Sequence, residues 1–255
     1  MSGDRYGEPW TRDEVILALY LYCQIPFQQT KASNPKVAAL AAALGRTPAS
    51  VARKLGNLGA SDMTLREKGI SGLAHTAAID RQVWTEFDGR WPLLIDEVAR
   101  IGRQNSNFGA DADLPILTWT GATESTTAGK RRRCQDFFRL AVLSSYDSRC
   151  CMCDMDLSEL LVAAHIVSWA KDELIRADPQ NGLCLCVLHH AAFDAGLLTL
   201  DQSLQMVCSP GVRSSRSQLV RDALLNAEGR RITLPRRFPP KAEYLQRHYE
   251  HTFRA

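Results

Sequence analysis

The sequence predicts an α+β protein in which a helical domain precedes a smaller domain of mixed helix and strand. Helix-start signals follow one another closely in residues 1–102, whereas the later part of the chain has short apolar runs of strand length among clustered Cys and His residues. The chain has 255 residues, of which 45% are hydrophobic and 23% charged, enough for one or two domains with ordinary cores. We therefore predict a helical domain at residues 1–102, a linker at 103–131 and a mixed domain at 132–255.

The amino-acid composition limits the classes of protein to which this chain could belong. The net charge of +3 does not make the chain a polycation, so evidence for a nucleic-acid partner has to be local. No apolar run approaches the ~18 residues that a membrane helix needs, and residues 1–10 lack the layout of a signal peptide. We expect a cytoplasmic protein with no membrane partner, in which clustered cysteines indicate metal binding rather than disulfides.

Successive helices are predicted in the first part of the helical domain. The first starts at Thr11, because Thr11 and Glu14 have the spacing of a capping box. Asn34-Pro35 is a good start for a second helix, which ends at Gly45. Thr47-Pro48 repeats the start signal at once, so a third helix follows after a very short turn.

The third helix has one apolar and one polar face. Val51, Leu55 and Leu58 recur at helical spacing and are expected in the core. Two helices with a short turn between them, the second helix being basic, match a helix-turn-helix layout and predict DNA contact through the polar face. The alternatives are a bundle with solvated charges and a dimerisation bundle, which would make the protein a homodimer. The residues predicted to contact DNA are Arg53, Lys54 and Asn57.

The rest of the region before the mixed domain is less regular. One longer amphipathic helix is expected at 80–101, followed by a linker rich in Asn, Ser, Gly and Thr that contains one short strand at 116–119. Four consecutive cations then suit an arm that contacts phosphates, although such runs are most often only solvated. These cations are Lys130, Arg131, Arg132 and Arg133.

Cys and His residues of the mixed domain have the spacing of zinc ligands. A C-x-x-C pair at 150–153 and a C-x-x-H pair at 186–189 together fit the tetrahedral set that Zn²⁺ prefers. Two other cysteines compete as ligands. Cys151 is too close to Cys153 in the sequence for the usual turn that places two thiolates on one zinc ion, and Cys184 lies on a predicted strand and could be a core thiol. We predict a structural zinc ion bound by Cys150, Cys153, Cys186 and His189.

Polar residues between and beside these pairs suit acid-base and metal chemistry. His165 ends an apolar strand, and a neutral imidazole is the natural general base near pH 7. Asn181 belongs to an Asn-Gly turn shortly ahead of the second pair. His190 and Asp194 are four residues apart on an expected short helix, so they share a face and could hold one divalent ion. Taken singly, these residues could equally be a core histidine, a turn asparagine and a solvated carboxylate.

The same motifs carry a resemblance to a known family. The segment 132–207, through Ala164-His165-Ile166, Asn181-Gly182-Leu183 and residues 190–196, resembles the HNH domain of bacterial restriction-type endonucleases, which has a ββα-metal fold. The resemblance implies a metal-dependent endonuclease that hydrolyses DNA in restriction or in defence against foreign DNA. It implies His165 as the general base, Asn181 and His190 as the other motif residues, a structural Zn²⁺, and a catalytic Mg²⁺, Mn²⁺ or Ni²⁺.

One position departs from the family pattern. Many HNH enzymes carry Asp or His as a metal ligand immediately before the general base, whereas this chain has Ala164. Either Asp194 is the second protein ligand beside His190, or the metal is bound more weakly and its coordination is completed by the scissile phosphate. Two alternatives stay open: a zinc-containing module that binds DNA without cutting it, and an HNH nuclease that acts on RNA or on modified DNA. The presence of a general base together with metal ligands favours the nuclease, since a binding module needs neither.

Overall fold

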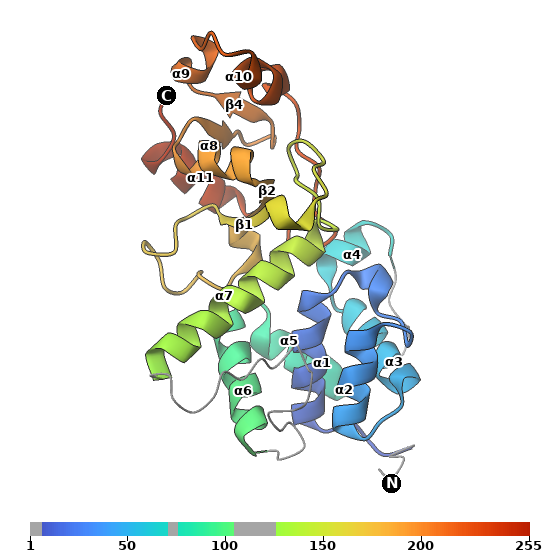
Figure 1. Ribbon diagram of the computed structural model, residues 1–255. Coiled ribbons are helices and arrows are strands. Elements are labelled where there is room, and N and C mark those ends of the chain that lie inside the picture. Colours follow the sequence, from blue (N-terminus) through green and yellow to red (C-terminus); the bar gives the residue numbers. More distant parts are fainter. Residues whose placement is uncertain (1–6, 71–75, 105–125) are drawn as a thin grey trace. The chain divides into compact units, whose positions relative to one another are not determined.

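The computed structural model describes residues 7–70, 76–104 and 126–255 (Figure 1). The chain divides into two compact units, Met1–Leu140 and Ala141–Ala255. The expected strand at 116–119 and most of the expected linker lie outside the described residues. The predicted division between residues 131 and 132 falls inside a long helix, so the first unit extends beyond the predicted linker.

The first unit is helical and is built around its first helix, α1 (Arg12–Gln24). Nearly all of α1 is buried, and it packs against α2, α3, α5 and α6. The predicted capping box at Thr11 is present, and α2 ends at Gly45 in the left-handed conformation (φ 63°) that the predicted stop signal requires. The other helices are α2 (Pro35–Leu44), α3 (Pro48–Gly59), α4 (Met63–Glu67), α5 (Ala78–Phe87), α6 (Trp91–Gln104) and most of α7 (Thr126–Ser145), with a 3₁₀ turn at Phe27–Gln29.

One expectation for this unit was wrong. The single helix expected at 80–101 is two helices, because Gly89 between α5 and α6 adopts φ +71°, a conformation that ends a helix. The four cations at 130–133 belong to helix α7, and their contact with phosphates stays a prediction. Most of α7 belongs to this unit, where Phe137 stacks on Tyr20, with ring centres 5.3 Å apart, and lies beside Trp91.

The second unit contains the predicted strand, strand, helix order. Strands β1 (Leu161–His165) and β2 (Gly182–Cys186) pair antiparallel, with His165 opposite Gly182, and α8 (Val187–Asp194) follows β2 directly and packs on both strands. A second hairpin, β3 (Leu198–Leu200) and β4 (Met206–Cys208), extends this core. The remaining elements are α9 (Pro210–Arg213), α10 (Gln218–Ala223), α11 (Ala242–His251) and 3₁₀ turns at Ser158–Leu160, Pro179–Asn181 and Leu225–Ala227.

Candidate metal centre and active site

The four predicted zinc ligands converge in the second unit. Cys150 and Cys153 lie on the turn before β1, and the other two donors come from the end of β2 and the first turn of α8. The Cys186 sulfur lies 3.1 Å from Nδ1 of His189, and the Cys153 and Cys186 sulfurs are 3.9 Å apart. All four donor atoms lie within 4.8 Å of one another, so the group could hold a zinc ion. The competing thiols Cys151 and Cys184 are buried outside this group.

The surroundings of this group fit a metal. Nε2 of His189 lies 3.0 Å from the backbone oxygen of Ala223, and because a carbonyl only accepts, Nε2 carries the proton and Nδ1 presents its lone pair to the sulfurs. Burial raises the pKa of Cys153 to about 12 and also raises the pKa of Cys150. Protein groups alone therefore leave these thiols protonated, and a bound Zn²⁺ would supply the charge that stabilises thiolates.

His165 stands at the end of β1 with its ring fixed by the following loop. Its Nε2 lies 3.0 Å from the backbone oxygen of Arg176, so Nε2 is the protonated nitrogen and Nδ1 is the unprotonated one. The ring also meets Trp169 edge-on, with centres 5.6 Å apart. Burial lowers the pKa of His165, which keeps the imidazole neutral near pH 7. A neutral imidazole with one unprotonated nitrogen can accept a proton.

Asn181 ties the two ends of the loop between β1 and β2 together. Its side chain is fully buried, its oxygen accepts from the backbone N–H of Val167 at 2.8 Å, and its amide nitrogen donates to the Val167 carbonyl at 3.1 Å. The same amide reaches the carbonyl of Ile175 at 3.5 Å. Asn181 therefore acts on the backbone two residues beyond His165, a role that an Asn-Gly turn signal by itself does not reveal.

His190 and Asp194 meet on one face of α8, as their spacing predicts. Nε2 of His190 and Oδ2 of Asp194 are 3.1 Å apart, and both side chains are partly exposed, at 31% and 57%. The hydrogen bond to Asp194 raises the pKa of His190. Both groups also lie close enough to affect the pKa of His165, where Asp194 opposes the lowering effect of burial and His190 adds to it. The site thus brings a neutral imidazole near two partly exposed donors that could bind a metal ion.

Comparison with known protein families identifies this segment. Residues 150–201 match the HNH endonuclease family. This HNH segment runs from the first cysteine pair through β1, β2 and α8 to the end of β3. It includes the four side chains that could hold zinc, and also His165, Asn181, His190 and Asp194. A search of curated proteins finds none that matches the chain. An HNH domain points to a nuclease with DNA as its substrate.

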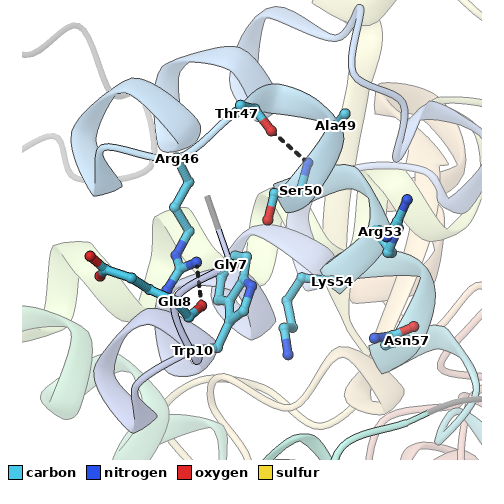
Figure 2. A pocket seen from close by; sticks show the side chains of 10 residues that line it. All are labelled: Gly7, Glu8, Trp10, Arg46, Thr47, Ala49, Ser50, Arg53, Lys54 and Asn57. Atoms are coloured by element: carbon cyan, nitrogen blue, oxygen red, sulfur yellow. Dashed lines mark hydrogen bonds between the residues drawn. The ribbon is translucent and has the colours of Figure 1, made fainter. Parts of the chain in front are cut away.

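In the first unit, outside the HNH segment, only part of the polar face of α3 is accessible. This face lines a hollow of about 470 Å³ whose other wall includes Gly7 and Trp10 (Figure 2). The Lys54 ammonium pairs at 2.6 Å with the buried carboxylate of Asp80 and lies 4.9 Å from the ring centre of Trp10. The prediction that Lys54 directs its charge outward was therefore wrong, because long-range pairing buries it.

The other predicted DNA contacts in the first unit differ in exposure. Arg53 is exposed and Asn57 is half-buried on the same helix, so both are accessible to a ligand. On α7, Lys130 pairs with Asp96 at 2.7 Å, with both side chains partly exposed. Arg131 and Arg132 are exposed and Arg133 is half-buried. Within the described residues, no helix is long and apolar enough to cross a membrane.

Proposed function

We propose that this protein is a metal-dependent DNA endonuclease that hydrolyses phosphodiester bonds. The observation that carries the proposal is the presence, within one HNH segment, of His165, whose Nε2 is held by the Arg176 carbonyl, and of the His190 and Asp194 pair on the following helix α8. A module that only binds DNA needs neither a base nor metal-binding donors. The broader setting that we propose is restriction or defence against foreign DNA in the cytoplasm, where thiol ligands stay reduced.

The general base in this proposal is His165. Its Nδ1 removes a proton from the water that attacks phosphorus, while the Arg176 carbonyl accepts from Nε2 and stabilises the imidazolium that forms. Asn181 keeps the ring in place, because its side chain fixes the backbone of Val167 beyond the strand end. The base must be neutral before the reaction, and burial favours that form by lowering the pKa of His165.

The donors of α8 fit a divalent cation. An imidazole nitrogen and a carboxylate oxygen 3.1 Å apart, both partly exposed, can serve as two ligands of Mg²⁺, Mn²⁺ or Ni²⁺ and leave room for phosphate oxygens. Such an ion, when bound, stabilises negative charge on the phosphate and on the leaving oxygen. The site of Cys150, Cys153, Cys186 and His189 is structural in this proposal, since four protein ligands leave no open position.

The first unit would contribute affinity for DNA. Arg53 and Asn57 on α3, with Arg131 and Arg132 on α7, are accessible and suit contacts to the phosphate backbone or to base edges. Lys54 has no part in this proposal, because its ammonium group forms a buried ion pair with Asp80.

The direct test incubates the purified full chain with supercoiled plasmid, genomic DNA, modified phage DNA and RNA in the presence of Mg²⁺, Mn²⁺ or Ni²⁺. We expect nicking or linearisation of DNA that EDTA abolishes and that His165→Ala lacks. Binding without cleavage under every ion would instead identify a DNA-binding module. Cleavage confined to RNA or to modified DNA would change the proposed substrate.

A further inference from the structure

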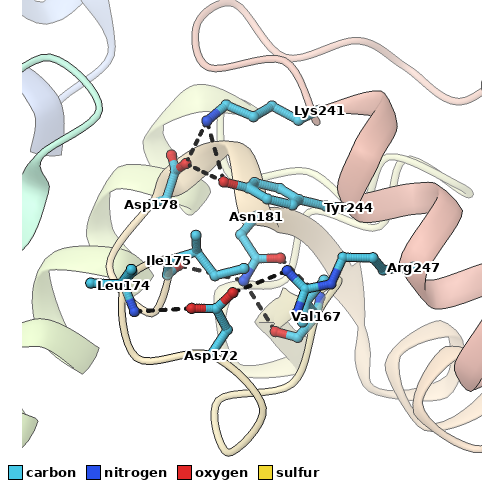
Figure 3. Close-up of polar contacts among 9 residues, drawn as sticks. All are labelled: Val167, Asp172, Leu174, Ile175, Asp178, Asn181, Lys241, Tyr244 and Arg247. Atoms are coloured by element: carbon cyan, nitrogen blue, oxygen red, sulfur yellow. Dashed lines mark hydrogen bonds and ion pairs between the residues drawn. The ribbon is translucent and has the colours of Figure 1, made fainter.

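Helix α11 lies outside the HNH segment yet contacts both halves of the candidate active site. The half that carries His165 consists of β1 and the loop at residues 166–180, whereas the metal-binding half is α8. Contacts from α11 and from the residue before it reach the loop (Figure 3). Contacts from α11 and from the residues after it reach α8 and the glycine beyond it.

Two charged clusters connect the loop to α11. Arg247 donates to Oδ2 of Asp172 at 3.0 Å, while Oδ1 of the same carboxylate accepts from the backbone N–H of Leu174. Tyr244 donates its hydroxyl to Oδ2 of Asp178 at 3.0 Å, and Lys241 lies 3.1 Å from that oxygen. Each carboxylate thus accepts from the loop backbone with one oxygen and binds α11, or the residue before it, with the other. In Asp178 the oxygen that faces the backbone is Oδ1, which caps the 3₁₀ turn that ends at Asn181.

The connection to α8 is apolar and backbone-mediated. The ring of His248 stacks on Phe193, with ring centres 3.7 Å apart and planes 13° apart, and its Nε2 donates to the Phe193 carbonyl at 3.1 Å. Phe193 immediately precedes Asp194. Beyond α11, Arg254 donates its N–H to the Gly196 carbonyl, and a Cβ at Gly196 would lie 2.0 Å from the Thr252 oxygen. The end of α8 is therefore packed directly against the chain that follows α11.

We infer that α11 sets the position of the His165 loop relative to the metal-binding helix, with Arg247 and Tyr244 as positioning residues for the cleavage step. The inference rests on the function proposed above for His165, His190 and Asp194. The ring of His165 depends on the Arg176 carbonyl, which lies in the loop between the two tethered carboxylates, Asp172 and Asp178. A misplacement of about 1 Å can cost on the order of 100-fold in rate, so loosening this loop lowers turnover even when all reacting groups remain.

A double-mutant cycle in the full chain tests this inference. The variants are Arg247→Gln, Asp172→Asn and the two combined; Asn keeps the acceptor for the Leu174 N–H but removes the charge. We expect each single variant to lower kcat on plasmid DNA by about 10- to 100-fold with KM little changed, and the combined variant to fall no further, because the two residues act through one contact. Arg247→Lys should retain part of the rate. Glu250→Ala, on an exposed part of the same helix, is the control and should cut like wild type.

Hydrogen exchange of residues 166–180 supplies a readout that does not depend on activity. Faster exchange in this loop is expected for Arg247→Gln and for Tyr244→Phe, with unchanged zinc content. A fall in activity for Arg247→Gln alone, with higher KM and no effect of Asp172→Asn, would overturn the inference and make Arg247 a DNA contact. Unchanged exchange and unchanged kcat in all variants would also overturn it. If wild type cuts no substrate with any ion, the proposed function fails, and exchange in the loop alone decides whether α11 positions it.

Discussion

His165 and Arg176 are joined by a 3.0 Å hydrogen bond from the imidazole Nε2 to a backbone carbonyl oxygen. The contact decides which ring nitrogen carries the proton, because a carbonyl accepts and never donates. Every residue type has that carbonyl, so the side chain at position 176 does not determine the tautomer of His165. The conformation of the loop does, which is why residues that shape the loop, such as Asn181, matter for the proposed base.

Zinc is expected to hold the second unit together. Protein purified without added metal should contain about one Zn per chain, and Cys150→Ala or Cys186→Ala should lose both the metal and the folded second unit, since structural zinc supplies on the order of 10 kcal/mol to a small site. Cys184→Ala is the matched control, because this buried thiol lies outside the group of four and its loss should leave the zinc content unchanged. Elemental analysis beside thermal melting makes the measurement. A folded wild type free of zinc would contradict the expectation.

The role of His165 as general base can be tested independently of the structural zinc site. His165→Ala should lower cleavage by at least ~100-fold, the usual scale for loss of a general base, with zinc content and melting temperature close to wild type. His251→Ala, an exposed histidine of α11, should cut normally and controls for the change of residue type. Undiminished cutting by His165→Ala would mean that another group activates the water.

Folding stability should fall in acid because of His248. Burial lowers its pKa to about 4, whereas an unfolded histidine has a pKa of about 6.5, so between these values the unfolded chain binds the extra proton. The free energy of unfolding therefore has its full value above about pH 6.5. As the pH falls toward 4, protonation of His248 in the unfolded chain lowers it by up to about 3 kcal/mol. Urea unfolding of wild type and His248→Gln across this range measures the difference, and the variant should show the shallower decline. Parallel curves would mean that His248 titrates normally in the folded protein.

Features set by short-range geometry were predictable from the sequence. The starts of α1, α2 and α3 follow from the side chains of Thr11, Asn34 and Thr47, each of which caps a backbone N–H within three residues. The zinc-binding group follows from two i, i+3 pairs, and the contact of His190 with Asp194 follows from one helical turn.

Features set by long-range contacts were not predictable in this way. The acceptor for His165 is a backbone atom, which leaves no trace in residue type. Arg247 and Asp172 are 75 positions apart, and nothing local indicates that they pair. Lys54 occupies a polar position in the helical pattern, and its burial depends on Asp80, which is 26 positions away in another helix. A single-sequence pattern therefore points to candidate reacting side chains more readily than to the residues that hold them in place.

Arg53 and Lys54, adjacent on α3, should respond differently to substitution. Lys54→Ala leaves the Asp80 carboxylate buried without its partner and should destabilise the first unit by about 3–5 kcal/mol, whereas Lys54→Met combined with Asp80→Leu should recover most of that loss. Arg53→Ala should leave the melting temperature unchanged and, if Arg53 contacts a phosphate, should reduce the salt dependence of DNA binding by about one unit of slope.

Gel-shift titrations of wild type and Arg53→Ala across a salt series measure DNA affinity and its salt dependence, and light scattering measures the oligomeric mass. Weaker binding with a flatter salt dependence and unchanged mass supports a DNA-contacting α3. If instead the first unit is a dimerisation bundle, Arg53→Ala binds DNA as wild type does, and a fragment that begins near Lys130 is monomeric whereas the full chain is a dimer. That result would remove α3 from the DNA interface while leaving the HNH segment and its chemistry in place, because no proposed catalytic or zinc-binding residue lies in the first unit.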